Sequence, residues 1–458
     1  MKKHILPILF ILLMIPLDTF SKGVTFVASK SGIVLDSDVY EGGGTDQTEK
    51  IQKILDKAVT LGRVHLVMDG AALISGTLRL HSNTTIECLD KSCGFFLADS
   101  SNCCMVTNAD ADAIVIRNRN ISLIGGTYNH NSPGQIHHRP YESGDFNPLK
   151  VFNHPYFVYS TCVYATEFYG VENLVMRDLT IANQRTYALN ICNWEHVTIE
   201  NVHIDRRVRP DAQNQDGLHF LGPGRYLTMR NVSGNSGDDF IAITPDELDF
   251  KSSISDVLID GVHLEDADQG IRILCCDKGS VDRVVVKNVT GTYRSYGFIV
   301  NPWFPGGGGH YGNIIFDTID LRPVKPNYGY MHPFLFKFGG NIESVTLRNI
   351  YHHMPEYPHH LIEVGRPYMM EYKGGDDQPT DIGCMIVDGL HIMEKDCIGE
   401  AYIDIRGSHI GLLSLSDVTV VRPGHEGKQG VLVRADTESS IDRLSTSNIS
   451  ADCLEEVY

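Results

Sequence analysis

The stretch LVMRDLTI, from Leu174 to Ile181, carries a pattern that recurs along most of the chain. Apolar residues stand at its first, third and sixth positions, and an Asn, Asp or Gly usually stands at the fifth. The further copies are VTIENVHI (197–204), LTMRNVSG (227–234), VLIDGVHL (257–264), VVVKNVTG (284–291), IIFDTIDL (314–321), VTLRNIYH (345–352), MIVDGLHI (385–392), LSLSDVTV (413–420) and LSTSNISA (444–451). Successive copies start 23, 30, 30, 27, 30, 31, 40, 28 and 31 residues apart.

This repeat decides the fold class. Alternation of apolar and polar residues predicts a half-buried strand, and the fifth residue tolerates the turn conformation that bends the chain. One copy is too short to bury its own apolar face, whereas stacked copies share one core. Leucine-rich repeats have another pattern, βαβ units need a helix in each period, and propellers need longer repeats. The chain is therefore predicted to be all-β, a right-handed parallel β-helix.

The N-terminal part departs from the repeat. Residues 46–59 (DQTEKIQKILDKAV) carry apolar side chains at helical spacing, which predicts a helix that caps the open end of the solenoid. Strands are expected in the segments VHLVM from Val64, TLRLHS from Thr77, TTIECL from Thr84, AIVIRN from Ala113 and NISLIGG from Asn120.

The first residues have the layout of an export signal. Lys2 and Lys3 precede an apolar run from Ile5 to Leu17, which is typical of a secretory signal peptide. We expect a signal peptide over 1–21, one β-helix domain over 22–458, no membrane span in the mature chain, and secretion or export to the periplasm. An N-terminal anchor helix is the alternative. The net charge of −18 argues against a nucleic-acid partner, which would need a basic surface.

Three stretches interrupt the repeat, at 126–169, 303–311 and 354–381. Long insertions on a rigid scaffold commonly carry function. We expect these loops to lie beside the solenoid as candidates for the walls of a groove.

Three aspartates form the candidate catalytic cluster. Asp216 lies in NQDGLHF, and Asp238 and Asp239 lie in SGDDFIAI. Asp239 follows Asp216 by 23 residues. A β-helix stacks residues one coil apart at about 4.8 Å, so the three carboxylates are expected to meet. Their repulsion would raise the pKa of at least one, which a general acid requires. Asp-Gly and Gly-Asp-Asp are also ordinary turn sequences.

Several segments resemble glycoside hydrolase family 28, the polygalacturonase-like pectinases within the pectate-lyase-like β-helix group. They are GGGTDQTEKIQKILDKA, SGTLRLHSNTTIE and LIGGTYNHN near the start, and NQDG, GDDFIAI and GIRIL in the centre. The resemblance implies an inverting hydrolase acting on an oligo- or polysaccharide. It assigns Asp238 as the proton donor, Asp216 and Asp239 as the carboxylates that hold the attacking water, and Asn214 as a residue that orients the site.

The chain also departs from the pattern of that family. The Gly-His-Gly motif is missing, and His219 and Asp268 are the candidates to replace its histidine. His219 could equally be a strand histidine that faces solvent. Arg272 in GIRIL matches the arginine of the Arg-Ile-Lys motif, while Leu274 replaces the lysine that would meet a sugar carboxylate. A neutral sugar is therefore as credible as galacturonate.

Aromatic and histidine side chains after the Arg272 coil are candidates for substrate binding in a groove wall, or for packing of a long loop. They are Tyr296, Trp303, His310, Tyr311 and Tyr328. No zinc, EF-hand or phosphate-loop motif is present, so we expect no metal and no cofactor.

Two other classes of function compete with hydrolysis. A polysaccharide lyase or epimerase would use Ca²⁺ held by Asp238 and Asp239, or Arg272 as a base, next to a uronate carboxylate. A non-catalytic β-helix would bind carbohydrate without turnover. The carboxylate spacing favours the hydrolase.

Overall fold

The computed structural model describes residues 24–135, 163–206, 215–247, 252–275, 278–302, 309–325, 333–353, 360–365, 380–394, 401–424 and 427–458. The expected signal peptide at 1–21, Asn214, Trp303 and Tyr328 lie outside these residues.

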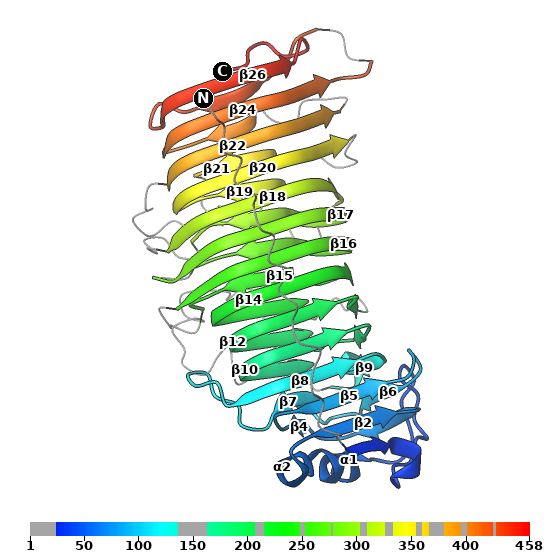
Figure 1. Ribbon diagram of the computed structural model, residues 1–458. Coiled ribbons are helices and arrows are strands. Elements are labelled where there is room, and N and C mark those ends of the chain that lie inside the picture. The colour runs from blue at the N-terminus through cyan, green and yellow to red at the C-terminus, as the bar shows by residue number, and fades with distance from the viewer. Residues whose placement is uncertain are drawn as a thin grey trace, which may run out of the picture.

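Parallel strands stacked in successive coils make up most of the described chain (Figure 1). The first nine are β1 (Val24–Val27), β2 (Val64–Met68), β3 (Ala71–Ile74), β4 (Leu78–Leu80), β5 (Thr84–Cys88), β6 (Gly94–Leu97), β7 (Val106–Asn108), β8 (Asn118–Ile124) and β9 (Thr127–Asn129). The next eight are β10 (Thr166–Arg177), β11 (Thr180–Ala182), β12 (Leu189–Glu200), β13 (His203–Asp205), β14 (Leu218–Gly234), β15 (Asp239–Thr244), β16 (Ser253–Ile273) and β17 (Ser280–Val300). The last nine are β18 (His310–Pro323), β19 (Phe334–Phe338), β20 (Asn341–His353), β21 (His360–Val364), β22 (Thr380–Met393), β23 (Ala401–Ile405), β24 (Ser408–Val421), β25 (Val431–Ala435) and β26 (Ser440–Ser450).

The register between coils follows the sequence repeat. Leu174, the first residue of one copy, pairs with Val197, the first residue of the next, and Val197 pairs with Leu227. The same holds for every later copy, through to Leu413 opposite Leu444. The predicted parallel β-helix is therefore confirmed. Its core is a continuous stack of these inward-facing apolar side chains, and their burial drives the stacking.

The fifth residue of each copy makes the bend. The backbone there is left-handed, with positive φ at Asp178, Asn201, Asn231, Gly261, Asn288, Thr318, Asn349, Gly389, Asp417 and Asn448. Asn, Asp and Gly accept this conformation more readily than other residues. Side chains at this corner also bond between coils, since the Asn201 amide donates to Asp178 Oδ1 at 2.7 Å.

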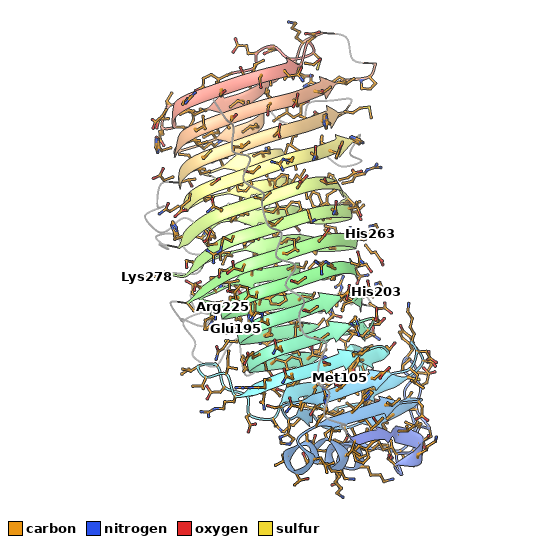
Figure 2. The ribbon with its side chains drawn as sticks, in the orientation of Figure 1. Met105, Glu195, His203, Arg225, His263 and Lys278 are labelled. Atoms are coloured by element: carbon orange, nitrogen blue, oxygen red, sulfur yellow. The ribbon has the colours of Figure 1, made fainter. Side chains whose placement is uncertain are left out.

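Ordered rows of polar residues continue on the outer surface (Figure 2). Glu195 and Arg225 lie on one edge of the stack, in register on adjacent coils, with Arg225 Nη2 2.8 Å from Glu195 Oε1. His203 and His263 lie on the opposite edge. Residues in register on adjacent coils therefore lie one above the other on the same edge of the stack.

Helices occur at the N-terminal end of the stack (Figure 1). The predicted capping helix is present but divided into α1 (Thr48–Leu55) and α2 (Ala58–Leu61). The apolar residues at helical spacing, Ile51, Ile54, Leu55 and Ala58, are buried. Two one-turn 3₁₀ helices are η1 (Ala28–Lys30) and η2 (Ser132–Gly134). No helix within the described ranges is long and apolar enough to cross a membrane.

The strands expected from Val64, Thr84 and Asn120 are found as β2, β5 and β8, and the one from Thr77 as the shorter β4. The strand predicted from Ala113 is wrong, because β8 begins only at Asn118. Asp112 Oδ1 accepts from the backbone N–H groups of Ile114 and Val115 at 2.9 and 3.1 Å. This local turn competes with strand pairing.

The expected interruptions differ in part from the observed loops. Residues 354–381 are not one loop, because β21 runs through them and β22 starts at Thr380. Strand β9 and the start of β10 lie within 126–169, and β18 begins inside 303–311. Residues 136–162, 303–308, 354–359 and 366–379 lie outside the described part of the chain.

Candidate active site

The three aspartates lie at the start of two strands that pair with each other on neighbouring coils, β14 and β15. Asp239 opens β15, and Asp216 stands two residues before β14. Leu218 pairs with Ile241, which brings Asp216 beside Asp239. The Gly217 N–H also donates to the Asp239 carbonyl oxygen at 2.9 Å. The 23-residue spacing is therefore one coil, as predicted.

A glycine makes this close approach possible. A Cβ at Gly217 would lie 2.3 Å from the backbone oxygen of Phe240, a distance that atoms do not tolerate. The glycine after Asp216 thus has a packing reason as well as a turn propensity.

Asp239 is held by a cation and a hydroxyl group. Arg272 Nε lies 2.8 Å from Asp239 Oδ2, and the Tyr296 hydroxyl donates to Asp239 Oδ1. The Asp239 side chain is 1% exposed and that of Arg272 is 8% exposed. Burial raises the pKa of Asp239 above its usual range, although Arg272 and Tyr296 act to lower it.

Asp216 is held by a histidine. His219 Nδ1 lies 2.9 Å from Asp216 Oδ2, and its other ring nitrogen, Nε2, lies 2.7 Å from Glu247 Oε2 and 2.8 Å from Thr244 Oγ1. The imidazole stacks on the Tyr187 ring, with 4.6 Å between ring centroids. His219 is fully buried, so the alternative that it is a strand histidine facing solvent is wrong.

The charge of this histidine follows from its two carboxylate neighbours. Burial acts to lower the pKa of His219, but Glu247 and Asp216 outweigh burial and raise it to about 9. Burial acts to raise the pKa of Glu247, but His219, Arg272 and the Thr244 hydroxyl bring it to about 2. At neutral pH, His219 is therefore an imidazolium between two carboxylates.

Asp238 differs from the other two aspartates. Its side chain is half-buried, and no hydrogen bond to its carboxyl group is found among the described residues. Loss of hydration, followed by the carboxylates of Asp216 and Asp239, raises its pKa well above the usual range, and Arg272 only partly opposes this. Asp238 therefore holds its proton more tightly than an ordinary aspartate does.

A fourth carboxyl group lies one coil further. Asp268 is opposite Asp238, because Gln269 pairs with Asp239. It is buried, and the Ser295 hydroxyl donates to its Oδ2 at 3.4 Å. Burial raises the pKa of Asp268 to about 7, although Ser295 and two arginines act to lower it. Asp268, which the sequence offered as a substrate-binding candidate, thus lies next to the aspartate cluster.

Two other candidates lie elsewhere. Tyr311 is part of the hydrophobic core, and its hydroxyl accepts from the Cys275 N–H at 2.9 Å. This corrects its expected place in a groove wall: Tyr311 pairs with the inward-facing Val281, so its ring points inside. His310 lies at the start of β18 and forms a partly exposed pair with Glu343 at 2.9 Å, with no contact to the carboxylates among the described residues.

Sequence reasoning missed Glu247, and it gave Tyr296 only as a candidate for a groove wall or for loop packing. One signal could have found Glu247: it follows His219 by 28 residues, close to one coil, as Asp239 follows Asp216. Tyr296 belongs to the row of Asp239 and Gln269, so coil register also predicts its contact.

No group of three or more His, Cys, Asp or Glu side chains in the described part of the chain is arranged to hold a metal ion. The arrangement instead places Asp238, a carboxyl group of raised pKa, beside two aspartates that buried basic side chains contact. Such a set can donate one proton and accept another.

Comparison with known proteins confirms the resemblance inferred from the sequence. The family described as glycosyl hydrolases family 28 matches residues 161–255, which include the three aspartates, His219 and Glu247. An exopolygalacturonase of Arabidopsis thaliana is 28% identical over 76 residues, covering 17% of this chain and 16% of its own. A polygalacturonase of Persea americana is 26% identical over 157 residues, covering 28% of this chain and 33% of its own. The chain thus spans a third or less of these relatives.

Solved structures share the fold over most of the chain. An exopolygalacturonase of Thermotoga maritima has a TM-score of 0.50 and 13% identity, covering 93% of this chain and 91% of that one. The A-module of a mannuronan C-5 epimerase of Azotobacter vinelandii has a TM-score of 0.52 and 10% identity, covering 93% and 97%. At these identities the likeness concerns the β-helix alone, and the chemistry depends on the site residues.

Proposed function

We propose that this protein is a glycoside hydrolase that cleaves a pectin-like or other complex glycan. Asp238 is the general acid, and Asp216 and Asp239 are the carboxylates that hold and activate water. One observation carries the proposal: an acid with a strongly raised pKa lies beside two carboxylates, each bound to a buried cation. The match to glycosyl hydrolases family 28 and the two polygalacturonases support the same class.

The roles follow from the charges. Asp238 gives its proton to the oxygen of the leaving sugar as the glycosidic C–O bond breaks. A water molecule forms the new bond to the anomeric carbon, and its proton passes to Asp216 or Asp239. Attack from the face opposite the leaving group inverts the anomeric configuration, in agreement with the resemblance.

We further propose a neutral sugar in the central subsite. Leu274, in the place of the expected lysine, is buried. Arg272 is already paired with Asp239 at 2.8 Å. Two coils further along the same row, Lys337 lies 3.1 Å from Glu363. In the described part of the site these cations thus have carboxylate partners, and a sugar carboxylate would have to compete with them.

Export is part of the same proposal. A polymeric glycan is degraded outside the cytoplasm, and the apolar run from Ile5 to Leu17 is typical of a secretory signal. The protein is therefore proposed to act as a secreted or periplasmic enzyme.

Product release from a panel of pectic, rhamnogalacturonan and galactose-rich glycans tests the proposal. Wild type should release reducing sugars, and Asp238→Asn should reduce the rate by about 10²- to 10⁴-fold, the usual contribution of general acid catalysis. Asp256→Asn is the matched control: it makes the same change at a surface corner, where Asn tolerates the left-handed backbone (φ 59°).

Three outcomes oppose the proposal. Equal rates for wild type and a folded Asp238→Asn would exclude Asp238 as the acid. An unsaturated product would indicate a lyase, and glycan binding without turnover would indicate a binding protein. Proton NMR of the first product formed shows whether the anomeric centre is inverted.

A separate outcome tests the neutral subsite. Release of galacturonate from unbranched polygalacturonate, with no activity on neutral linkages, would exclude it.

A further inference from the structure

Glu247 is connected to both cations that hold the proposed base carboxylates. Its Oε2 atom lies 2.7 Å from His219 Nε2 and 3.7 Å from Arg272 Nη2. His219 contacts Asp216 through its other nitrogen, and Arg272 contacts Asp239 through Nε. One carboxylate thus bridges two buried contacts that lead to different aspartates.

The position of Glu247 is fixed locally. It follows β15 by three residues, and the Thr244 hydroxyl at the end of that strand donates to its Oε2 at 2.9 Å. The side chain of Glu247 is 17% exposed, whereas that of His219 is fully buried. Glu247 therefore lies at the outer end of the chain of contacts, and the aspartates lie at its inner end.

Charge balance gives Glu247 a specific task. Asp216, Asp238, Asp239 and Glu247 are four acidic groups around two cations, His219 and Arg272, and Asp268 one coil further acts on Asp238 as well. His219 faces Asp216 and Glu247 directly, feels the charge of Asp239, and stacks on Tyr187. Without Glu247, burial of the imidazole would be opposed by fewer negative charges, so the histidine would lose its proton more easily.

We propose that Glu247 is a positioning residue that fixes His219 and Arg272, and thereby holds Asp216 and Asp239 in place to bind the attacking water. Among the described residues no contact between Glu247 and either aspartate is found, so it acts on them through the two cations. This assignment rests on the proposed hydrolase function and adds a residue to it.

Glu247→Gln tests the assignment, because glutamine keeps the shape and removes the charge. The value of kcat should fall by about 10- to 100-fold, as is typical when a partner that orients an active-site group is lost, and KM should change little. The alkaline limb of the pH profile should move to lower pH, because His219 then deprotonates earlier. Glu247→Asp, which restores the charge with a shorter reach, should recover part of both properties.

A matched control separates this role from general stability. His352 and Glu394 form another buried pair, with 2.9 Å between Nε2 and Oε2 and side chains 3% and 2% exposed. Glu394→Gln should lower the melting temperature at least as much as Glu247→Gln, yet leave the pH profile of wild type unchanged. A pH profile of folded Glu247→Gln that superimposes on that of wild type would overturn the assignment.

A second readout does not need activity. In protein with isotopically labelled histidine, the ring signal of His219 is identified by its loss in His219→Gln, and its titration is followed by NMR. The midpoint should be lower in Glu247→Gln than in wild type, and an unchanged midpoint would overturn the assignment. If no glycan is cleaved, the proposed function fails, while this titration still decides whether Glu247 controls His219.

Discussion

Arg272 and Asp239 form an ion pair of 2.8 Å between side chains that are 8% and 1% exposed. They belong to adjacent coils, in which Ala242 pairs with Arg272 and Asp239 pairs with Gln269. Breaking a buried pair leaves an uncompensated charge. The ion pair therefore links the stability of two coils to the ionisation of a proposed catalytic group.

Arg272→Met is predicted to raise the pKa of Asp239, because the guanidinium acts to lower it. The acid limb of the pH profile of kcat/KM should then move to higher pH, and activity should fall most at acidic pH. Arg272→Lys keeps the charge and should keep most of the profile. Arg434→Met is the control, since Arg434 forms a similar pair with Asp404 at 3.1 Å away from the aspartate cluster. An unchanged acid limb in folded Arg272→Met would exclude this role.

Tyr296→Phe is predicted to act on the same limb. The Tyr296 hydroxyl donates to Asp239 and acts to lower its pKa, so its removal should shift the acid limb to higher pH by less than Arg272→Met does. Tyr293→Phe, another fully buried tyrosine of β17, is the control and should leave the profile in place. Similar pH profiles for the two variants would show that the hydroxyl contact has no catalytic consequence.

The periodic part of this molecule was predictable, because its signals are local. Each fifth residue of the repeat makes the bend, which the residue type favours at every copy except Thr318, and each first residue pairs with the first residue of the next copy. The 23-residue spacing, about one coil, likewise predicted that Asp216 lies beside Asp239. Fold and carboxylate cluster thus follow from spacing alone.

Contacts that depend on loops were not predictable in the same way. The 28-residue spacing brings Glu247 near His219, but their contact also depends on how the chain turns after β15, which the repeat does not encode. Tyr311 follows an insertion that hides the phase of its strand, and a shift of one residue exchanges inward and outward faces. Loop geometry and strand phase therefore need the structure.

Chelation of divalent cations is predicted to leave activity unchanged. Both carboxylate oxygens of Asp239 already have partners, Tyr296 at Oδ1 and Arg272 at Oδ2, so a Ca²⁺ ion would have to displace a guanidinium. Reducing ends should form at the same rate before and after dialysis against a chelator, without an ultraviolet-absorbing product. Loss of activity that Ca²⁺ restores, together with such a product, would instead support the lyase.

Asp268→Asn is predicted to stabilise the fold at neutral and alkaline pH. The folded-state pKa of Asp268 is about 7, against an ordinary value of 3.8, because burial disfavours the charged form. A raised folded-state pKa contributes stability below the unfolded-state value, and this is lost as the pH rises through about 7. Each pKa unit corresponds to about 1.4 kcal/mol, so the penalty that asparagine removes is at most a few kcal/mol.

Melting temperatures between pH 4 and pH 9 measure this effect. The difference between Asp268→Asn and wild type should grow from acidic pH up to about pH 7 and then level off, at roughly 2 °C or more for a chain of this size. Asp388→Asn is the control, because Asp388 forms a half-exposed pair with Arg348 several coils away, and such surface pairs contribute little. A difference that does not change with pH would show that Asp268 ionises in the fold as easily as in the unfolded chain. A site that tolerates this penalty uses Asp268 for something other than stability, which is consistent with its proposed place beside the substrate.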